Sequence, residues 1–372
     1  MKYNWQLKDW TNFRYNTTEI NELAYDCLKN ISIFAGNITA LPEDIKQETI
    51  IHFMVSEAVK TSAIEGEIVS REDVLSSIRN HFGLHTKTKQ VKDLKAEGIS
   101  KVMIDAYQTF NKPISKKMLN DWHLMLFQEQ IGQSKMNTGK YRTHKEPTQV
   151  VSGPIGKEKI HFIAPPSKNI EEEMKYFVQW FNQTAPGKQH EIKAAPIRSA
   201  IAHLYFESIH PFEDGNGRIG RAISEKALAQ SLGCPILISL SQEIEANKKS
   251  YYFNLERAQK LNEITEWVKY FLEMINASII RTKSQLTFIL EKSRFFDKFK
   301  NKLNERQKKV INRMLEEGPL GFKGGITARK YISITKCSKA TATRDLTELL
   351  TMQAIKRLPG KGRNISYELA LH

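Results

Sequence analysis

Apolar side chains recur at helical spacing along most of the chain, and this pattern predicts a mainly α fold. Near the N-terminus, Thr18 can cap a helix with one apolar face. That face consists of Ile20, Leu23, Ala24, Cys27, Leu28 and Ile31. A second helix runs toward Gly66, a residue type suited to a helix end. Ser70 can then open a third helix, in a capping-box arrangement with Asp73.

The helical pattern is interrupted by two short apolar runs, 149–151 and 160–163. They flank a Gly/Pro turn at 153–156, and together these segments predict a β-hairpin. Helical spacing then returns, first in a helix that Ser167 can cap and next in one that Pro196 can open. The second of these helices leads directly into the most polar and glycine-rich loop of the chain.

The last segment, 301–372, differs from the rest in charge. It has fifteen Lys and Arg against six Asp and Glu, a net of +9 out of +15 for the whole chain. Such a basic module suggests a nucleic acid or another anionic partner. Its pattern predicts helices at 304–317, 326–334 and 338–350, then strands at 355–358 and 365–369 around a turn at 360–363. This order resembles a winged helix–turn–helix, which can bind DNA or serve protein contacts and dimerisation.

Composition excludes several classes of protein. The best short apolar run, Pro235 to Leu240, is far too short to cross a bilayer, and the first residues lack the apolar region of a signal peptide. The three cysteines, Cys27, Cys234 and Cys337, are too few and too scattered for a disulfide framework or a zinc site. We therefore expect a cytoplasmic protein that does not associate with a membrane.

The candidate chemistry is concentrated in the 210–221 loop, His-Pro-Phe-Glu-Asp-Gly-Asn-Gly-Arg-Ile-Gly-Arg. A turn built from Gly and Asn can point successive N–H groups into one anion-binding nest, to which a following helix N-terminus adds positive charge. Arg218 and Arg221 lie one helical turn apart and suit a di- or triphosphate. Asp214 can hold Mg²⁺, and His210 can accept a proton. An ordinary turn between helices would not need this set of residues.

The loop resembles the full signature of Fic-domain proteins, His-x-Phe-x-Asp/Glu-Gly-Asn-Gly-Arg-x-x-Arg, at every specified position. The resemblance implies an all-helical Fic core with a β-hairpin flap, and Mg²⁺-dependent transfer of AMP from ATP to a Ser, Thr or Tyr hydroxyl of a protein. It implies that His210 is the general base, Asp214 the Mg²⁺ ligand and Arg221 the ligand of the γ-phosphate, while Phe212 anchors the loop. The implied phosphate cradle consists of Gly215, Asn216, Gly217 and Arg218.

AMP transfer requires attack at the α-phosphorus with pyrophosphate leaving, so catalysis rests mostly on positioning and charge neutralisation. Phosphoryl transfer from the same nucleotide would instead involve attack at the γ-phosphorus. The spacing of the residues does not distinguish these reactions, and it is the family resemblance that favours AMP transfer.

Two further segments resemble parts of the nucleotide site. The hairpin is similar to the family's flap, which implies that its first strand lies against nucleotide and target at Val150, Val151, Ser152 and Gly153. The pair Tyr251-Tyr252 resembles the aromatic residues that line the family's adenosine pocket. Close relatives would have Asn seven residues after that pair, whereas this chain has Gln259. A structural hairpin and a core Tyr pair are the simpler alternatives.

Thr61-Ser62-Ala63-Ile64-Glu65-Gly66 matches the family's inhibitory motif, Ser/Thr-x-x-x-Glu-Gly/Asn. Its position before the catalytic loop resembles the subclass with an N-terminal inhibitory helix. Glu65 can pair with Arg221 and occupy the charge that would receive the γ-phosphate, which leaves a bound nucleotide badly aimed. The alternative is that Glu65 is a surface residue at a helix end. We therefore predict an inhibitory site formed by Thr61, Glu65 and Gly66.

These observations predict an N-terminal helical domain with the inhibitory helix (1–110), a Fic core with its following helices (111–300) and a C-terminal winged module (301–372). The leading hypothesis is a self-inhibited protein adenylyltransferase whose partners are ATP, Mg²⁺ and a protein hydroxyl, its own included. One alternative is a DNA-binding regulator with a nucleotide-sensing Fic part. Another is removal of AMP from a target, as some relatives do. Homodimer formation stays open.

Overall fold

The computed structural model describes residues 2–84, 89–132, 136–153, 159–236, 238–299, 301–316, 318, 321–359 and 365–371. The chain divides into two compact units, Met1–Ile279 and Ile280–His372. Helices dominate both units, and the strands of the described residues form two separate antiparallel hairpins. The prediction of a mainly α fold with a hairpin is therefore confirmed. None of the described helices is both long and apolar enough to cross a membrane.

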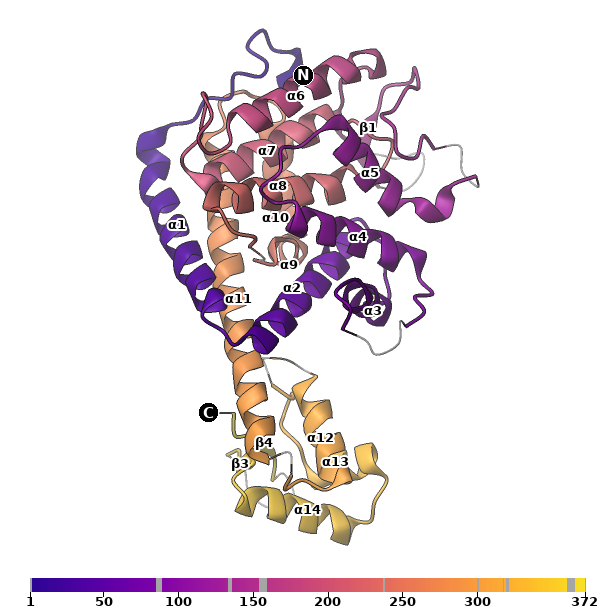
Figure 1. The fold of residues 1–372 in the computed structure, drawn as a ribbon, viewed down its shortest axis with the longest axis vertical. Coiled ribbons are helices and arrows are strands. Elements are labelled where there is room, and N and C mark those ends of the chain that lie inside the picture. Colours follow the sequence, from indigo (N-terminus) through magenta and orange to yellow (C-terminus); the bar gives the residue numbers. More distant parts are fainter. Residues whose placement is uncertain are drawn as a thin grey trace. The chain divides into compact units, whose positions relative to one another are not determined.

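The first unit begins with a short turn η1 (Asn4–Gln6), and its next helices are α1 (Thr17–Thr39), α2 (Glu43–Ile64), α3 (Arg71–His81) and α4 (Leu94–Gln108). Helices α2, α3 and α4 pack together (Figure 1). The predicted cap at Thr18 is wrong, because the Asn16 side chain accepts the hydrogen bond of the Thr18 N–H at 3.1 Å and caps α1 instead. Ser70 does cap α3, but the Asp73 carboxylate accepts the Asp93 N–H at 2.8 Å rather than completing a capping box.

The centre of this unit consists of α5 (Lys116–Leu126), α6 (Ile170–Gln183), α7 (Ala195–Ile209) and α8 (Asn216–Leu232), with the short turns η2 (Gln128–Gln130) and η3 (Ser167–Asn169). Helices α7 and α8 pack along each other, and every residue of α7 is buried. Pro196 lies in the first turn of α7, as predicted. Ser167 does not cap α6, because it begins η3 and its hydroxyl accepts a hydrogen bond from Arg142 at 2.9 Å.

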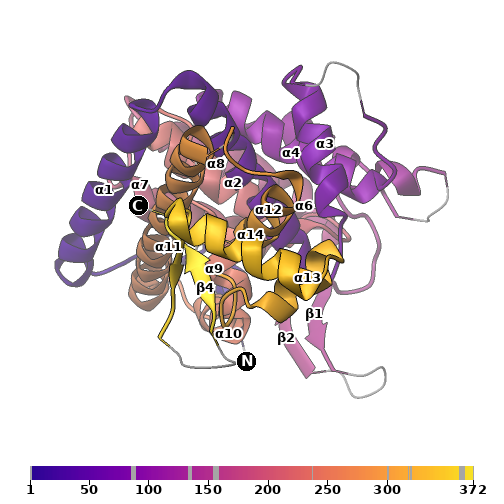
Figure 2. The same cartoon turned by 90° about the horizontal axis from the view of Figure 1, so that it is seen from below.

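The predicted hairpin is formed by β1 (Gln149–Ser152) and β2 (Lys159–Ile163), which pair antiparallel (Figure 2). Most of the turn predicted at 153–156 lies outside the described residues. The base of the hairpin is attached to the N-terminal segment, since the Trp5 indole N–H donates to the Ile163 carbonyl at 2.7 Å. The hairpin is therefore fixed at the end nearest the helical core.

Three helices follow: α9 (Leu240–Ala246), α10 (Lys248–Ala258) and α11 (Thr265–Phe299). Helix α9 packs against α2, and the buried Glu57 carboxylate of α2 accepts a hydrogen bond from the Ser241 N–H at 3.1 Å. The Trp267 indole N–H donates to the Ala200 carbonyl at 2.9 Å, which attaches the start of α11 to α7. The regions predicted as an N-terminal domain and a Fic core thus pack within one compact unit up to Ile279.

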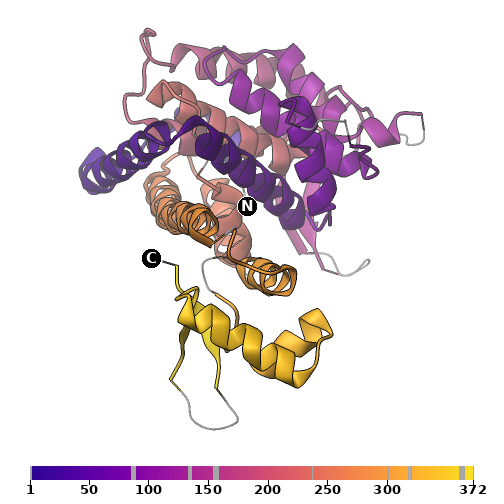
Figure 3. The same cartoon turned by 60° about the horizontal axis from the view of Figure 1, so that its bottom comes forward.

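The second unit starts at Ile280, inside α11, whereas the boundary predicted from the charge falls at Lys300, outside the described residues. Its further elements are α12 (Glu305–Leu315), α13 (Ala328–Thr335), α14 (Lys339–Thr351), β3 (Ile355–Arg357) and β4 (Tyr367–Leu369) (Figure 3). The buried Asp345 carboxylate joins the three helices, because it accepts hydrogen bonds from Arg306 and Tyr331, both at 2.8 Å. Ser338 caps α14, as predicted, and the turn predicted at 360–363 lies outside the described residues.

Candidate active site

The 210–221 loop begins where α7 ends, and its first residue has an unusual backbone. His210 adopts the left-handed conformation, with φ 52° and ψ 60°. A residue with a side chain pays about 1–3 kcal/mol for such a conformation, so the surroundings must enforce it. The Arg142 Nε donates to the His210 carbonyl at 2.8 Å, and the His210 N–H donates to the Phe206 carbonyl at 2.9 Å. These bonds hold the backbone of His210 in this conformation, and its side chain lines a cavity beside the loop.

Asn216 closes the loop through its side chain. Its amide oxygen accepts the Phe212 N–H at 2.9 Å, and its amide nitrogen donates to the Phe212 carbonyl at 2.8 Å. The Phe212 ring is fully buried and stacks on the His123 imidazole with 4.3 Å between ring centroids. Gly215, with φ 79°, precedes α8, and a Cβ there would lie only 2.8 Å from the Phe127 ring. The loop is therefore fixed to the core at both of its ends.

Arg142 is a buried brace that the sequence did not reveal. Its guanidinium donates to the Pro165 carbonyl at 2.5 Å and to the Ser167 hydroxyl at 2.9 Å, and its backbone N–H donates to the Pro211 carbonyl at 3.0 Å. With the bond to His210, these contacts join the loop to the segment that leads from the hairpin into α6. Only 1% of Arg142 is exposed.

The charge state of the His210 imidazole depends on its burial. Burial, together with the nearby Arg142 charge, lowers the pKa of His210 to about 4, so the ring is neutral at pH 7. Burial raises the pKa of the Glu207 carboxyl to about 8, and the charge of Glu65 adds to this effect. The two side chains approach to 3.7 Å, between His210 Nδ1 and Glu207 Oε2. At neutral pH the proton therefore resides on Glu207, and His210 is left as a free base.

Arg221 lies almost fully buried in α8 and is held by the residues of the predicted inhibitory motif. Its Nε donates to the Thr61 hydroxyl at 2.6 Å, and its Nη2 reaches the Thr61 carbonyl at 2.9 Å and the Glu65 carboxylate at 2.7 Å. Burial alone would raise the pKa of Glu65, but the Arg221 charge outweighs it and the pKa lies below its usual value. A Cβ at Gly217 would overlap the Glu65 carboxylate. Gly66, with φ 80°, follows the end of α2.

Arg218 is also paired with an acid that follows the inhibitory motif. Its Nη1 forms an ion pair with the Glu67 carboxylate, and its Nη2 lies 3.7 Å from Asp214. Its guanidinium also lies over the Phe127 ring, 4.9 Å from the centroid. Its side chain is only 3% exposed, so Glu67 is part of what covers it. Arg218 was predicted from its sequence motif, whereas Glu67 lies just beyond the predicted inhibitory motif.

The end of α2, the hairpin and most of the loop border a cavity of about 700 Å³, a volume typical of small-molecule sites, although Arg218 and Thr61 are not among its lining residues. Its lining includes parts of the 210–221 loop, the end of α2, both strands of the hairpin and the start of α10. Among the predicted residues, the lining comprises Glu65, Gly66, Val150, Val151, His210, Asp214, Gly215, Asn216, Gly217, Arg221, Tyr251 and Tyr252. The structure thus brings together segments that are far apart in the sequence around a single cavity.

The predicted adenosine and flap residues differ in their exposure. Tyr251 is 1% exposed, and its hydroxyl bonds with the His203 imidazole at 2.7 Å, so it packs mainly in the core. Tyr252 is 37% exposed and is the more accessible of the pair. The Gln259 amide donates to the Glu207 carbonyl at 3.1 Å. The side chain of Ser152 lies outside the described part of the chain, and Gly153 is not among the described residues that line the cavity.

Lys248, the first residue of α10, is a further lining residue that the sequence analysis did not identify. Its ammonium donates to the Ile64 carbonyl at the end of α2 and lies 5.9 Å from the centroid of the Tyr252 ring. A cation at a helix C-terminus is favourable because the last carbonyls carry partial negative charge. Lys248 therefore links the end of the predicted inhibitory helix to the predicted adenosine side of the cavity.

The residues at the cavity fit a Mg²⁺ ion that is held mostly by a substrate. Mg²⁺ is commonly bound by one or two carboxylates while phosphate oxygens and waters complete its shell. Asp214 lines the cavity with a side chain that is 62% exposed. Within the described ranges, no cluster of three or more His, Cys, Asp or Glu could form a metal site from protein groups alone. A single accessible carboxylate is what such a substrate-held ion requires.

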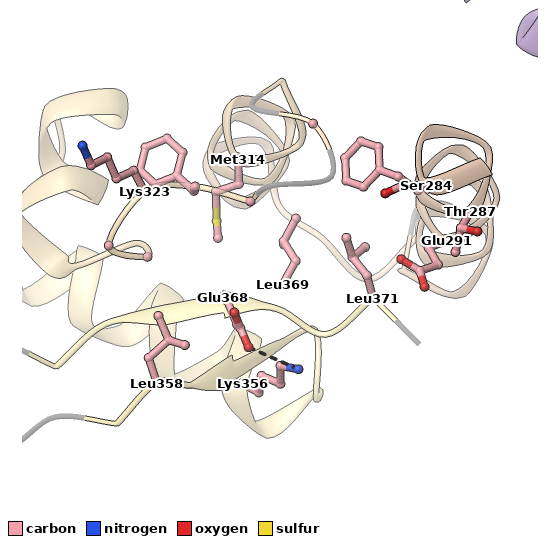
Figure 4. Close-up of a pocket in the computed structure, with 16 residues that line it drawn as sticks. Ser284, Thr287, Glu291, Met314, Lys323, Lys356, Leu358, Glu368, Leu369 and Leu371 are labelled. Carbon is pink, nitrogen blue, oxygen red and sulfur yellow. Dashed lines mark ion pairs between the residues drawn. The ribbon is translucent and has the colours of Figure 1, made fainter. Parts of the chain in front are cut away.

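A second cavity, of about 620 Å³, lies within the unit that begins at Ile280 (Figure 4). Met314, Leu369 and Leu371 line it on the apolar side. Lys356 and Glu368 lie on its strand side and form an ion pair at 3.2 Å. None of the site residues predicted from the sequence lies there.

Comparison with known proteins matches two segments of the chain to family models. The family model described as "Fic/DOC family" matches residues 113–228, and the one described as "Domain of unknown function (DUF4172)" matches residues 3–84. A "Protein adenylyltransferase fic-1" from Caenorhabditis briggsae is 30% identical over 146 residues, 39% of this chain and 25% of the relative. A "Probable protein adenylyltransferase" from Aquifex aeolicus is 28% identical over 33% of this chain and 39% of the relative. The chain thus spans between about a quarter and two fifths of these relatives.

Solved structures show the same fold at low identity. A Fic family protein from Desulfovibrio desulfuricans aligns with a TM-score of 0.53 and 18% identity over 94% of this chain and 96% of its own. A Fic-domain-containing signaling protein from Bacteroides thetaiotaomicron aligns with a TM-score of 0.50 and 17% identity over 70% of this chain and 97% of its own. The matched segment contains both the hairpin and the 210–221 loop. The chain therefore carries a Fic domain, of the Fic/DOC family, at residues 113–228.

Proposed function

We propose that this protein transfers AMP from ATP to a hydroxyl group of a protein and that Glu65 keeps this activity low. The observation that carries the proposal is the cavity into which the neutral His210, the loop glycines and Arg221 all face. The names of the relatives as protein adenylyltransferases agree with it. The protein that supplies the hydroxyl, whether another protein or this chain itself, is not specified by these features.

In the proposed reaction, the target hydroxyl attacks the α-phosphorus of ATP. The new O–P bond forms as the bond to the β-phosphate oxygen breaks, and pyrophosphate leaves. His210 accepts the hydroxyl proton, a role that suits an imidazole that is neutral at pH 7 and lines the cavity. Arg218, Arg221 and the N–H groups at the start of α8 hold the phosphates in line for this attack.

Asp214 is the residue that would hold Mg²⁺, because it is the exposed carboxylate at the nest. A bound Mg²⁺ would neutralise phosphate charge. The protein itself supplies the orientation, through the two bonds from Asn216 to Phe212 and the contacts of Arg142 with the loop. Those bonds are formed between groups of the protein itself and do not involve a ligand, so they can preorganise the site.

The proposed inhibition follows from the bond between Glu65 and Arg221. While the carboxylate holds the guanidinium at 2.7 Å, Arg221 is not available to a terminal phosphate. A nucleotide bound without that contact would have its α-phosphorus misplaced, and a displacement of about 1 Å can cost about 100-fold in rate.

The test is incubation of the purified chain with Mg²⁺ and ATP labelled at the α-phosphate, in a cell extract. Glu65→Gly should increase the label on protein about 10- to 100-fold, and His210→Ala should decrease it about 100- to 10,000-fold, the range for loss of a general base. ATP labelled at the γ-phosphate is the matched control, and any label that it gives in the extract should be the same with wild type, Glu65→Gly and His210→Ala. Label that came from the γ-phosphate alone and changed with these variants would replace AMP transfer with phosphoryl transfer.

A second candidate function is DNA binding by the C-terminal unit. Lys339, Thr343 and Arg344 are exposed on α14, the third of the helices that precede the strand pair, where a winged helix would contact DNA. The logarithm of the binding constant for a DNA duplex should then fall linearly with the logarithm of the salt concentration. If no duplex binds at low salt, DNA binding by the C-terminal unit is excluded. AMP removal, the other alternative, is tested by following release of label from an already modified target.

A further inference from the structure

We propose that Glu67 is a second inhibitory carboxylate, which competes with nucleotide phosphate for Arg218 while Glu65 competes for Arg221. This inference rests on the proposed function, because it assumes that the cradle of the 210–221 loop binds phosphate groups. It extends the predicted motif, which ends at Gly66, and it assigns Glu67 an effect on how tightly phosphate binds.

The geometry of the 65–67 turn directs both carboxylates to the same helix turn. The N–H groups of Glu65 and Glu67 both donate to the Ser62 carbonyl, at 3.1 and 3.0 Å, and the positive φ of Gly66 lets the chain turn between them. Glu65 thereby reaches Arg221, and Glu67 reaches Arg218.

This pairing gives the 65–67 turn the charge pattern of a phosphate chain. Two carboxylates face two guanidiniums that lie one turn apart on α8. Phosphate and carboxylate bind a guanidinium through the same charge-assisted hydrogen bonds, so they cannot share the same N–H groups. The Arg218 and Arg221 side chains are 3% and 1% exposed, and Glu67 and Glu65 hold N–H groups that a phosphate would need, so a phosphate bound there would take the place of these carboxylates.

If a phosphate binds Arg218, the Glu67 carboxylate still has a second cationic partner, Lys95. The Lys95 ammonium lies 3.4 Å from Glu67 Oε1, while it is Oε2 that pairs with Arg218. A displaced Glu67 therefore keeps one ion pair and is also 20% exposed to water. The same ammonium lies 3.7 Å from Glu129. Exchange of Glu67 for a phosphate is consequently less costly than leaving a buried carboxylate unpaired.

The test measures binding of tripolyphosphate and of ATP to the full chain by calorimetry, without Mg²⁺. Glu67→Gln should lower the Kd of tripolyphosphate about tenfold, because a charge-assisted bond to Arg218 is lost only from the unbound state. Glu129→Gln is the matched control, since Glu129 also contacts Lys95 and has no bond to Arg218. It should change the Kd less than about twofold. Adenosine, which has no phosphate, should bind equally well to wild type and both variants.

Glu67→Ala provides a second variant with no amide to bond with Arg218, and its effect should be at least as large. Equal shifts in the Glu67 and Glu129 variants would show a general charge effect and would overturn the inference, as would an unchanged Kd in both Glu67 variants. Tripolyphosphate binding does not depend on catalysis. A tenfold shift in a chain that never transfers AMP would therefore refute the proposed function and support the competition at Arg218.

Discussion

The 210–221 loop and the 65–67 turn meet at the same two arginines, yet they are held in different ways. The loop is attached by bonds to backbone atoms: Asn216 to Phe212 and Arg142 to His210 and Pro211. Its anchor residues are almost fully buried. Local unfolding is rare where buried contacts are dense, so this part of the site is static.

The 65–67 turn, by contrast, depends on side-chain ion pairs that reach partly into water. The Glu65 and Glu67 side chains are 26% and 20% exposed, whereas the Arg221 and Arg218 side chains that they pair with are 1% and 3% exposed. In the proposed inhibition, the 65–67 turn would therefore be the part that moves, while the two arginines stay in place. The variants below change one half at a time, in order of decreasing expected effect.

Removing the loop's own closure should have the largest effect. Asn216→Ala leaves the buried N–H and carbonyl of Phe212 without partners, which costs about 2–4 kcal/mol and lowers Tm by about 5–10 °C. AMP transfer should fall at least about 100-fold, because the nest loses its shape. Asn254→Ala is the control, since the Asn254 amide donates to the Ser250 carbonyl within α10. Melting curves and label transfer measure both effects, and a variant with wild-type Tm would show that the loop does not need this closure.

Weakening the contacts that hold Arg221 beside the 65–67 turn should raise AMP transfer rather than lower it. Thr61→Val keeps the shape of the side chain and removes the hydroxyl that accepts the Arg221 Nε–H. The clamp on Arg221 weakens, and AMP transfer should rise about three- to tenfold, the size of one such hydrogen bond. Ser62→Ala is the control, because this neighbouring buried hydroxyl has no hydrogen bond. Loss of activity in Thr61→Val would mean that Thr61 supports the active arrangement of Arg221 instead.

The last prediction concerns stability rather than AMP transfer, and it involves the proton that Glu207 binds beside His210. The pKa of Glu207 is raised to about 8, so between the usual carboxyl range and pH 8 the folded state binds a proton that the unfolded state does not. Stability should therefore fall as pH rises through this window. Glu207→Gln removes that dependence, and its Tm should change less than that of wild type between pH 5.5 and pH 8. Glu213→Gln, at the same cavity, should keep the wild-type slope, and identical slopes in all three proteins would contradict the raised pKa.

The parts of the site that consist of consecutive residues could be predicted from the sequence, whereas contacts between residues far apart in the sequence were harder to predict. The 210–221 loop is contiguous, and its residue types alone indicated a phosphate nest. The pairing of Glu65 with Arg221 was predicted through the family motif, and the structure shows that contact together with a hydrogen bond from Arg221 to Thr61 that was not predicted. Glu67 stands two residues after Glu65, and this short spacing could have indicated that its carboxylate lies near the same arginines. Arg142 offered none, because an isolated arginine in a loop does not reveal which carbonyls it will meet.

Some of the cap predictions failed for a related reason, although Ser70 and Ser338 do cap their helices. Thr18 and Asp73 are suitable residue types in suitable positions, but Asn16 and the N–H of Asp93 offered competing partners. Ser167 likewise bonds with Arg142, a residue that is distant in sequence. Short polar side chains can satisfy several arrangements, so their choice depends on which partner the fold brings near.

By itself, the sequence determined the mainly helical fold, the hairpin and the chemical character of the 210–221 loop, because helical periodicity and a contiguous motif are local properties. Only the tertiary structure decided which charges meet. It placed Glu67 on Arg218, a proton on Glu207 beside His210, and Lys248 at the end of α2. The reason is physical: burial and the distance between charges set both pairing and protonation, and neither exists before the chain has packed.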